Sequence, residues 1–302
     1  MRKVMKVAVL TTMAGAISVL ASAQDRFANV EIKSQPVAGG VFMLQGAGGN
    51  IAVFSGEDGI FLVDDQYAPL TEKIRASLKE ITDKPVRFVV NTHWHGDHTG
   101  GNENFGEAGA LVVAHENVRK RMSAEQFMKE LGRTVPASPA AALPVITFTD
   151  ATTFHWNGDE VHVQHLAPAH TDGDSMVHFR EANVIHTGDT FFNGSYPFID
   201  LSSGGSVQGM VAAMDRVLAL ADDRTKIIPG HGALSNRAEL KQQRDLLVEL
   251  RDRIQVLVDK GLSREEVIAA KPTREYDAEY GQFFMKPDVW TGIVYDSLVR
   301  TQ

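Results

Sequence analysis

Short apolar runs separated by glycine turns predict that the chain begins its folded part as a meander of β-strands. Three such runs, over residues 41–44, 51–54 and 60–63, are rich in β-branched and aromatic residues and too short for helices. The glycine-rich residues 46–50 between the first two suit a flexible turn better than a lid. A helix over residues 70–81 and a buried strand over 87–90 should follow.

The rest of the chain repeats this pattern of strands followed by helices. A strand over 110–113, a helix over 116–131 and a Pro- and Ala-rich linker over 133–144 complete the first half. The second half predicts strands over 145–148, 152–156, 161–166, 176–179, 184–186 and 227–228, helices over 207–220 and 238–260, and two shorter helical segments after them. Such an α/β pattern suits two sheets packed face to face with helices outside, a four-layer αββα sandwich, although periodicity alone does not choose it.

The N-terminus has the pattern of a signal peptide. Three basic residues within the first six precede an apolar run over residues 7–20, which ends in the small-x-small site Ala21-Ser22-Ala23. The alternative, a permanent anchor, needs about 20 apolar residues, and this run is shorter. We therefore expect a signal peptide over residues 1–23 and a folded domain over 24–302. This domain should be secreted, with a periplasmic location in a Gram-negative source and without a stable membrane anchor.

Composition narrows the kinds of partner and of metal site. The formal net charge is −8, and loss of the basic N-terminal segment makes it more negative, which argues against nucleic acid because such recognition needs a basic face. The chain has no cysteine. Any metal site must therefore use nitrogen and oxygen ligands, and the expected partner is a small-molecule substrate.

Four metal-ligand side chains fall within six residues directly after the strand expected over 87–90. These are His93, His95, Asp97 and His98. In an extended segment, side chains alternate, so His93 and His95 point to the same side, and a turn at Gly96 can direct the next two toward a second ion. Histidines also occur as helix caps and core residues, but this spacing favours a metal site.

Three further candidates stand in short polar loops that follow apolar strands. They are His170, Asp189 and His231, each distant from the first cluster in sequence. Alone, each would more often be a turn residue than a ligand, but together with the first cluster they indicate a complete metal site. His115 and His186 are candidates to support the ligands from behind.

The motif His-x-His-x-Asp-His over residues 93–98, followed in order by the three isolated residues, resembles that of the metallo-β-lactamase superfamily. The resemblance covers nearly all of residues 24–302 and implies the αββα fold and two zinc ions, with manganese or iron as alternatives. It implies that one metal is held by His93, His95 and His170, that the other is held by Asp97, His98 and His231, and that Asp189 bridges both.

Neutral imidazoles and carboxylates suit zinc, and an open position shared by two metals can hold hydroxide at neutral pH. That hydroxide is the expected nucleophile, with Asp97 as the catalytic residue that orients it and passes a proton to the leaving group. Phe192 and Asn193 follow the bridging position and are candidates for substrate binding. A plain core role for the aromatic residues near Asp189, including Phe191 and Tyr196, is an equally good interpretation.

The family resemblance does not choose the substrate. Aspartate at the bridging position, where true metallo-β-lactamases carry cysteine or serine, speaks against efficient β-lactam turnover. Secretion and the run after Asp189 favour a β-lactamase-like acyl hydrolase with at least weak β-lactamase activity. A lactonase, thioesterase or phosphodiesterase of the same fold remains an alternative, as does a non-hydrolytic periplasmic metal-binding accessory protein.

Overall fold

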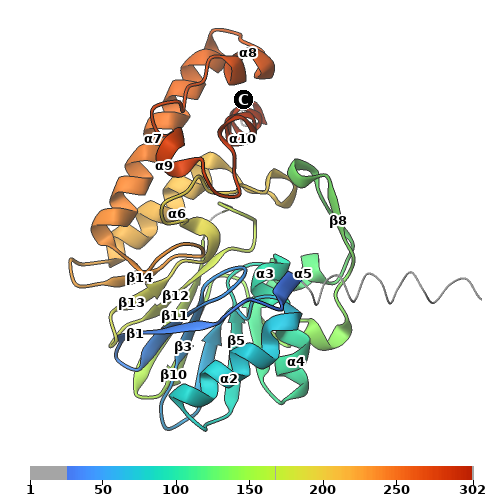
Figure 1. Ribbon diagram of the computed structural model, residues 1–302, viewed down its shortest axis with the longest axis vertical. Coiled ribbons are helices and arrows are strands. Elements are labelled where there is room, and N and C mark those ends of the chain that lie inside the picture. The colour runs from blue at the N-terminus through green and yellow to red at the C-terminus, as the bar shows by residue number, and fades with distance from the viewer. Residues whose placement is uncertain (1–25, 167, 301–302) are drawn as a thin grey trace, which may run out of the picture.

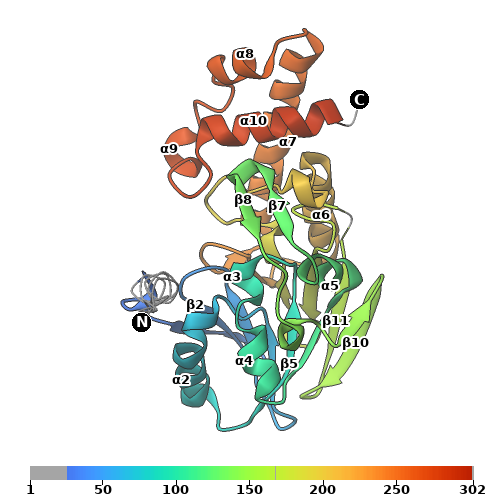
Figure 2. The same cartoon turned by 90° about the vertical axis from the view of Figure 1, so that its right-hand side faces the viewer.

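Two β-sheets lie face to face in the lower part of the molecule, and helices cover both outer faces (Figures 1 and 2). The computed structural model describes residues 26–166 and 168–300. The predicted signal peptide therefore lies outside the described residues. Within them, no helix combines the length and the apolar character needed to cross a membrane.

The first sheet contains the predicted meander at one side and parallel strands at the other. Its seven strands within the described residues are β1 (Lys33–Ala38), β2 (Val41–Gln45), β3 (Ile51–Phe54), β4 (Ile60–Val63), β5 (Val86–Asn91), β6 (Leu111–His115) and β9 (Ile146–Phe148), in that order. Neighbours from β1 to β4 are antiparallel, and β4, β5, β6 and β9 are parallel. The strand predicted over 145–148 thus joins the first sheet and not the second half, because it pairs with β6.

The second sheet is built from the strands of the second half. Over the same described ranges its order is β10 (Ala151–Trp156), β11 (Asp159–His165), β12 (Ser175–Phe179), β13 (Val184–His186), β14 (Lys226–Ile228) and β15 (Ser235–Asn236). Only β13 and β14 are parallel neighbours here. The helix α6 (Val207–Leu220) connects these two strands, as a parallel pair requires.

Alternation along the strands divides the apolar residues between two layers. In β4, Phe61 and Val63 face the second sheet, whereas Ile60 and Leu62 face the helices α2 (Thr71–Ile81) and α4 (Asn102–Glu107). The outer face of the second sheet packs instead against α6, α7 (Arg237–Asp259) and α10 (Pro287–Arg300). The predicted αββα sandwich is confirmed.

The C-terminal helices form a lobe above the sheets (Figure 2). After α7 come α8 (Arg264–Ala269), α9 (Asp277–Tyr280) and α10, so three helices follow within the described residues, where the sequence predicts two. The face of α7 that carries Leu240, Leu247 and Leu250 is buried. The long helix therefore serves as a core element, with only its other face in solvent.

The prediction of one helix over 116–131 and a linker after it is wrong. The helix α5 (Glu116–Met122) ends early, and β7 (Gln126–Met128) pairs with β8 (Arg133–Val135) as an antiparallel hairpin. Met128 is buried in the main core cluster, so tertiary packing overrides the local helix preference. The remaining short elements are α3 (Gly96–Thr99) and the 3₁₀ turns Ala68–Leu70, Lys129–Leu131, Ala140–Ala142, Gly188–Thr190 and Leu201–Ser203.

Candidate metal centre

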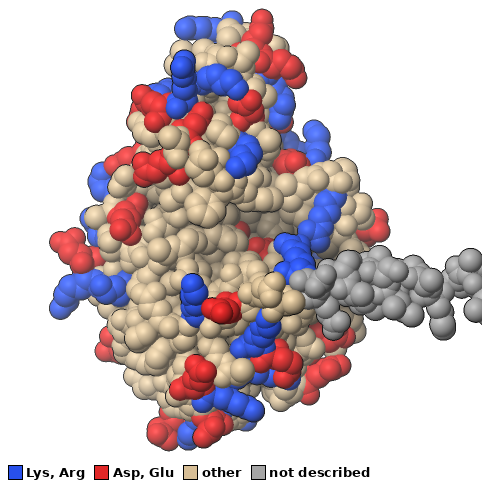
Figure 3. Space-filling model, in the orientation of Figure 1, with Lys and Arg blue, Asp and Glu red and all other residues tan. Residues whose placement is uncertain are grey.

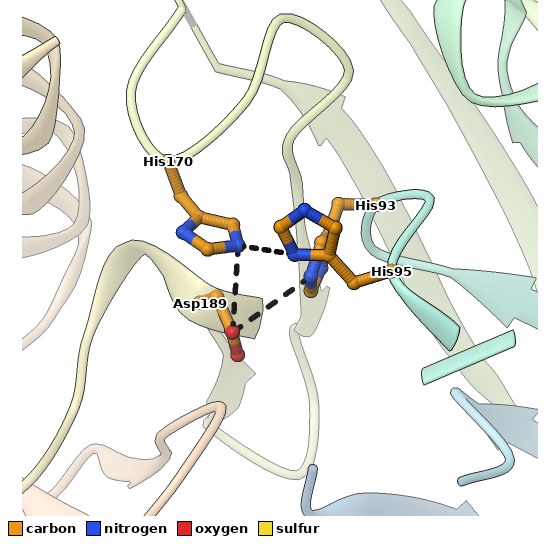
Figure 4. A group of neighbouring side chains, drawn as sticks. All are labelled: His93, His95, His170 and Asp189. Carbon is orange, nitrogen blue, oxygen red and sulfur yellow. Dashed lines mark hydrogen bonds and ion pairs between the residues drawn. The ribbon is translucent and has the colours of Figure 1, made fainter. Parts of the chain in front are cut away.

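Loops from both sheets meet at one edge of the sandwich and bring all seven predicted ligands together. The loop after β5 and the helix α3 carry four of them, and the loops after β11, β13 and β14 carry one each. They form two groups, in each of which the ligand atoms lie within 4.8 Å of one another: His93, His95, His170 and Asp189 in one, Asp97, His98 and His231 in the other. Figure 4 shows the side chains of the first group pointing toward one another from their loops.

The first group closes tightly around one point. Nε2 of His170 lies 2.8 Å from Nδ1 of His95 and 3.5 Å from Oδ2 of Asp189. Nε2 of His93 lies 3.7 Å from the same Asp189 oxygen. Three imidazole nitrogens and one carboxylate oxygen are thus presented together, which matches the ligand types and number that zinc prefers.

The second group shares Asp189 with the first. Nε2 of His231 lies 3.4 Å from Nε2 of His98 and 3.4 Å from Oδ2 of Asp97. Asp189 reaches this group through Oδ1, 3.1 Å from His98 Nε2, and through Oδ2, 3.3 Å from His231 Nε2. Asp189 therefore stands between two sets of ligands, the position of a bridging carboxylate.

Four of the histidines are held from behind, so that one ring nitrogen of each is free to face the centre. The contacts are Thr92 Oγ1 with His93 Nδ1 (3.0 Å), Asp200 Oδ2 with His95 Nε2 (3.0 Å), Asp64 Oδ2 with His98 Nδ1 (2.7 Å), and Phe198 O with His170 Nδ1 (2.8 Å). Such partners fix the tautomer and the ring orientation of a metal ligand. His93 Nε2, on the inward side, is buried and has no hydrogen-bond partner among the described residues, as expected of an atom that needs a metal.

The sequence did not indicate the supporting role of Asp64 or Asp200. Asp64 follows β4 and is buried, with a φ of 64° that L-residues other than asparagine and aspartate rarely adopt. It also accepts hydrogen bonds from the backbone and hydroxyl of Thr92, at 2.8 Å each. Its place directly after an apolar strand is a sequence signal that could have identified it.

Comparison with known proteins agrees with this geometry. The family model described as the metallo-beta-lactamase superfamily matches residues 45–231, more than half of the chain and every predicted ligand. The chain belongs to the metallo-β-lactamase superfamily. The resemblance carried by the motif from His93 to His98 is thereby confirmed at the level of the family.

Individual proteins similar to this chain share less than a third of its residues in the aligned stretches. A hydroxyacylglutathione hydrolase from Nitrosococcus oceani is 28% identical over 50% of this chain and 50% of its own length. An acyl-coenzyme A thioesterase from Bos taurus is 21% identical over 63% of this chain and 72% of its length. The chain thus spans about half the length of the first of these relatives. A sec-alkylsulfatase structure from Pseudomonas sp. has a TM-score of 0.68 and 19% identity, over 88% of this chain and 50% of that one, which shows a shared fold.

Burial and charge set the protonation states that metal binding requires. Burial lowers the pKa of His93 well below its usual range and that of His170 to about 4. Burial alone would raise the pKa of Asp189, but His98 and His231 lower it well below its usual range. At neutral pH, His93 and His170 are therefore neutral imidazoles and Asp189 is a carboxylate, which are the forms that bind metals.

The glycine-rich turn over residues 46–50 is part of the site. Asn50 donates through Nδ2 to Pro229 O (2.8 Å) and Gly232 O (3.0 Å), on either side of His231. Its own carbonyl accepts from Nε2 of His186 (3.0 Å). A Cβ at Gly49 would lie 2.1 Å from the His98 ring, so only glycine allows this approach.

His186 and His115, the two candidates for support from behind, differ in position. His186 is buried and accepts a hydrogen bond at Nδ1 from the backbone N–H of Gly188, next to Asp189. His115 stacks on His165, with ring centroids 3.8 Å apart, and bonds Thr149 O. Only His186 therefore contacts a loop that carries a predicted ligand.

A cavity of about 530 Å³ opens onto the two groups. Phe192 lines it and stacks on the ring of His231, with centroids 5.0 Å apart, and Tyr196 also lines it. Phe191 is fully buried in the core and does not line it. Asn193 does not line it either, and its amide donates to Ala233 O (3.1 Å), so its predicted contact with substrate needs a different side-chain rotamer.

Proposed function

We propose that this chain is a dinuclear, zinc-dependent hydrolase of acyl bonds, acting on an ester or thioester. One observation supports it above the others. Asp189 contacts both ligand groups, and both groups border one cavity that is large enough for a small molecule. A site built only to hold a structural metal would be closed, because its ligands would complete the coordination shell.

The residues present fit two metal ions of the zinc type. The donors are imidazole nitrogens and carboxylate oxygens, the ligand types that zinc prefers. When bound, such ions polarise a substrate carbonyl and lower the pKa of water. Asp97 is the ligand whose carboxylate is partly exposed, at 23%, and lines the cavity. It is therefore placed to accept a proton from water and return it to the leaving group.

The choice of acyl substrate draws on the relatives and on the bridging residue. The two curated relatives described above are named as thioester-type hydrolases, acting on hydroxyacylglutathione and on acyl-coenzyme A. Aspartate at position 189 supports the same choice over efficient β-lactam turnover. Weak β-lactamase activity remains part of the proposal, and lactone and phosphodiester cleavage are the alternatives.

The test combines metal analysis with a substrate panel. Purified protein should contain about two zinc ions per chain by elemental mass spectrometry, and it should cleave a thioester faster than a lactone, a chromogenic cephalosporin or a bis-aryl phosphodiester. Asp97→Asn should lower kcat more than it raises KM, because binding contacts remain. Tightly bound metal without turnover of any of the four would instead support a metal-binding accessory protein.

We also propose that the protein is exported and works in the periplasm. The basic, apolar and small-residue segments over residues 1–23 support this. The N-terminal sequence of protein from a periplasmic extract should begin at Gln24. Recovery of uncleaved protein from the cytoplasm would contradict the proposal.

A further inference from the structure

The walls of the cavity differ chemically from its floor. The floor is formed by the candidate metal ligands, whereas Met128, Leu131 and Val135 from the β7–β8 hairpin line one side. Phe283 and Phe284, from the loop between α9 and α10, line the cavity as well. Figure 3 shows a hollowed, largely uncharged surface below the helical lobe, with basic side chains at its right-hand edge.

The side chains of these two phenylalanines are unusually exposed for large apolar residues. Phe283 is 66% and Phe284 is 64% exposed, and Phe284 contacts Phe198 edge-on, with centroids 6.1 Å apart. Apolar side chains of this size that lie together at a cavity mouth indicate a surface that an apolar ligand covers. Both lie beyond residue 231, outside the stretch matched by the family model.

Two arginines supply the positive charge of the cavity. Besides the candidate metal ligands, Arg26 and Arg133 are its charged lining residues within the described chain. The guanidinium of Arg26 lies over the Tyr67 ring, 5.6 Å from its centroid. Arg133, on β8, makes no side-chain hydrogen bond or ion pair with any residue in 26–166 or 168–300. In a protein with more acidic than basic residues, an arginine left without a carboxylate partner beside an apolar cavity suits an anionic ligand.

We propose that the substrate is an anionic amphiphile, an ester or thioester with an apolar acyl chain and a negatively charged group on the leaving side. The chain lies between the hairpin and the α9–α10 loop, and the charged group lies at Arg133 and Arg26. Water adds across the acyl bond, so that the products are a carboxylic acid and a charged alcohol or thiol. This inference rests on the proposed hydrolase function for the reaction, but not for the binding of the amphiphile.

Four matched esters test the two parts of the site separately. They are the 4-nitrophenyl esters of acetate and octanoate, each with and without a carboxylate beside the nitro group. The zinc-loaded protein should prefer octanoate over acetate by about tenfold or more in kcat/KM, since buried methylene groups add to binding. Phe283→Ala with Phe284→Ala should remove most of that preference. Arg133→Gln should lower kcat/KM by about fivefold for the carboxylated esters alone, a size typical of a solvent-exposed ion pair.

Matched controls separate these effects from general changes in the surface. Phe127→Ala removes a phenylalanine that is 59% exposed on the same hairpin but does not line the cavity. Arg274→Gln removes an arginine that lines a different depression. Both should behave as the parent protein. Equal effects of Arg133→Gln on charged and uncharged esters, or an unchanged chain-length preference in the phenylalanine variant, would overturn the inference.

A binding measurement distinguishes failure of this inference from failure of the proposed function. Octane-1-sulfonate should bind more tightly than octan-1-ol by calorimetry, and Arg133→Gln should reduce the difference by about fivefold. If the sulfonate binds in this way while no ester is cleaved, the hydrolase proposal fails and the ligand class stands. If esters are cleaved but the two ligands bind alike, the hydrolase stands and the ligand class is wrong.

Discussion

Replacing Asp64 by asparagine should weaken the second metal site without removing a metal ligand. Oδ2 of Asp64 accepts from His98 Nδ1 (2.7 Å) and from Thr92 Oγ1 (2.8 Å), while Oδ1 accepts from the Thr92 backbone (2.8 Å). Asparagine tolerates the φ of 64°. The substitution therefore changes the hydrogen-bonding chemistry and leaves the backbone in place.

The size of the effect follows from these three bonds. If the amide oxygen keeps the Thr92 backbone bond, the NH₂ group faces the two donors that Oδ2 accepted. His98 must then either lose its partner or change tautomer, and the second outcome puts a proton on Nε2, the atom that faces Asp189. Loss of such a partner lowers metal affinity by roughly 10- to 100-fold. A buried donor left unpaired also lowers the free energy of unfolding by about 1–3 kcal/mol.

Competition with a chromophoric chelator measures the two zinc dissociation constants, and thermal unfolding of metal-free protein measures stability. Asp65→Asn is the matched control. Asp65 is buried beside Asp64, and its backbone N–H donates to His98 O, but its carboxylate accepts from the Gly101 backbone and not from a histidine ring. Burial raises the pKa of Asp65 well above its usual range, so that asparagine imitates its neutral form. Unchanged binding of the second zinc in Asp64→Asn, or an equal loss in both variants, would refute the proposed support of His98.

Four further substitutions address other parts of the site. Asp189→Ala should reduce occupancy of both metals and His231→Ala mainly of the second, and two tightly bound ions in both variants would contradict the ligand assignment. Asn50→Ala leaves the carbonyl of Pro229 unpaired and removes one of the two hydrogen bonds to Gly232 O, so it should cost about 2 kcal/mol of stability and weaken the second metal, as unfolding and chelator titrations can show. Burial and the hydrogen bond to Asp277 raise the pKa of Tyr196, so its contribution to stability is complete below about pH 10 and lost as pH rises further. Tyr196→Phe should therefore unfold with a weaker dependence on alkaline pH, and an unchanged dependence would exclude this role.

The sequence predicts the strands and the seven candidate ligands better than it predicts the residues and elements that pack around them. Strands such as β3 and β4 can be predicted because their apolar residues form short runs between glycines. The residues from His93 to His98 can be recognised because side chains that bind metals cluster there. Asp64 and Asn50 carry no such signal, since their roles depend on contacts with loops that are distant in sequence. The β7–β8 hairpin was missed for the same reason, because its burial against the core decides its structure.

The residues proposed for the chemistry and those proposed for substrate specificity also lie in different parts of the chain. The residues that face the two candidate metals lie on loops fixed by strands of both sheets, inside the stretch that the superfamily model matches. The residues that line the outer cavity lie on the β7–β8 hairpin and, for Phe283 and Phe284, beyond that stretch, next to α10. Exchanging the α9–α10 loop should therefore change which acyl chains are preferred while the content of bound zinc stays the same. A loss of zinc on such an exchange would show that the helical lobe also holds the ligand loops in place.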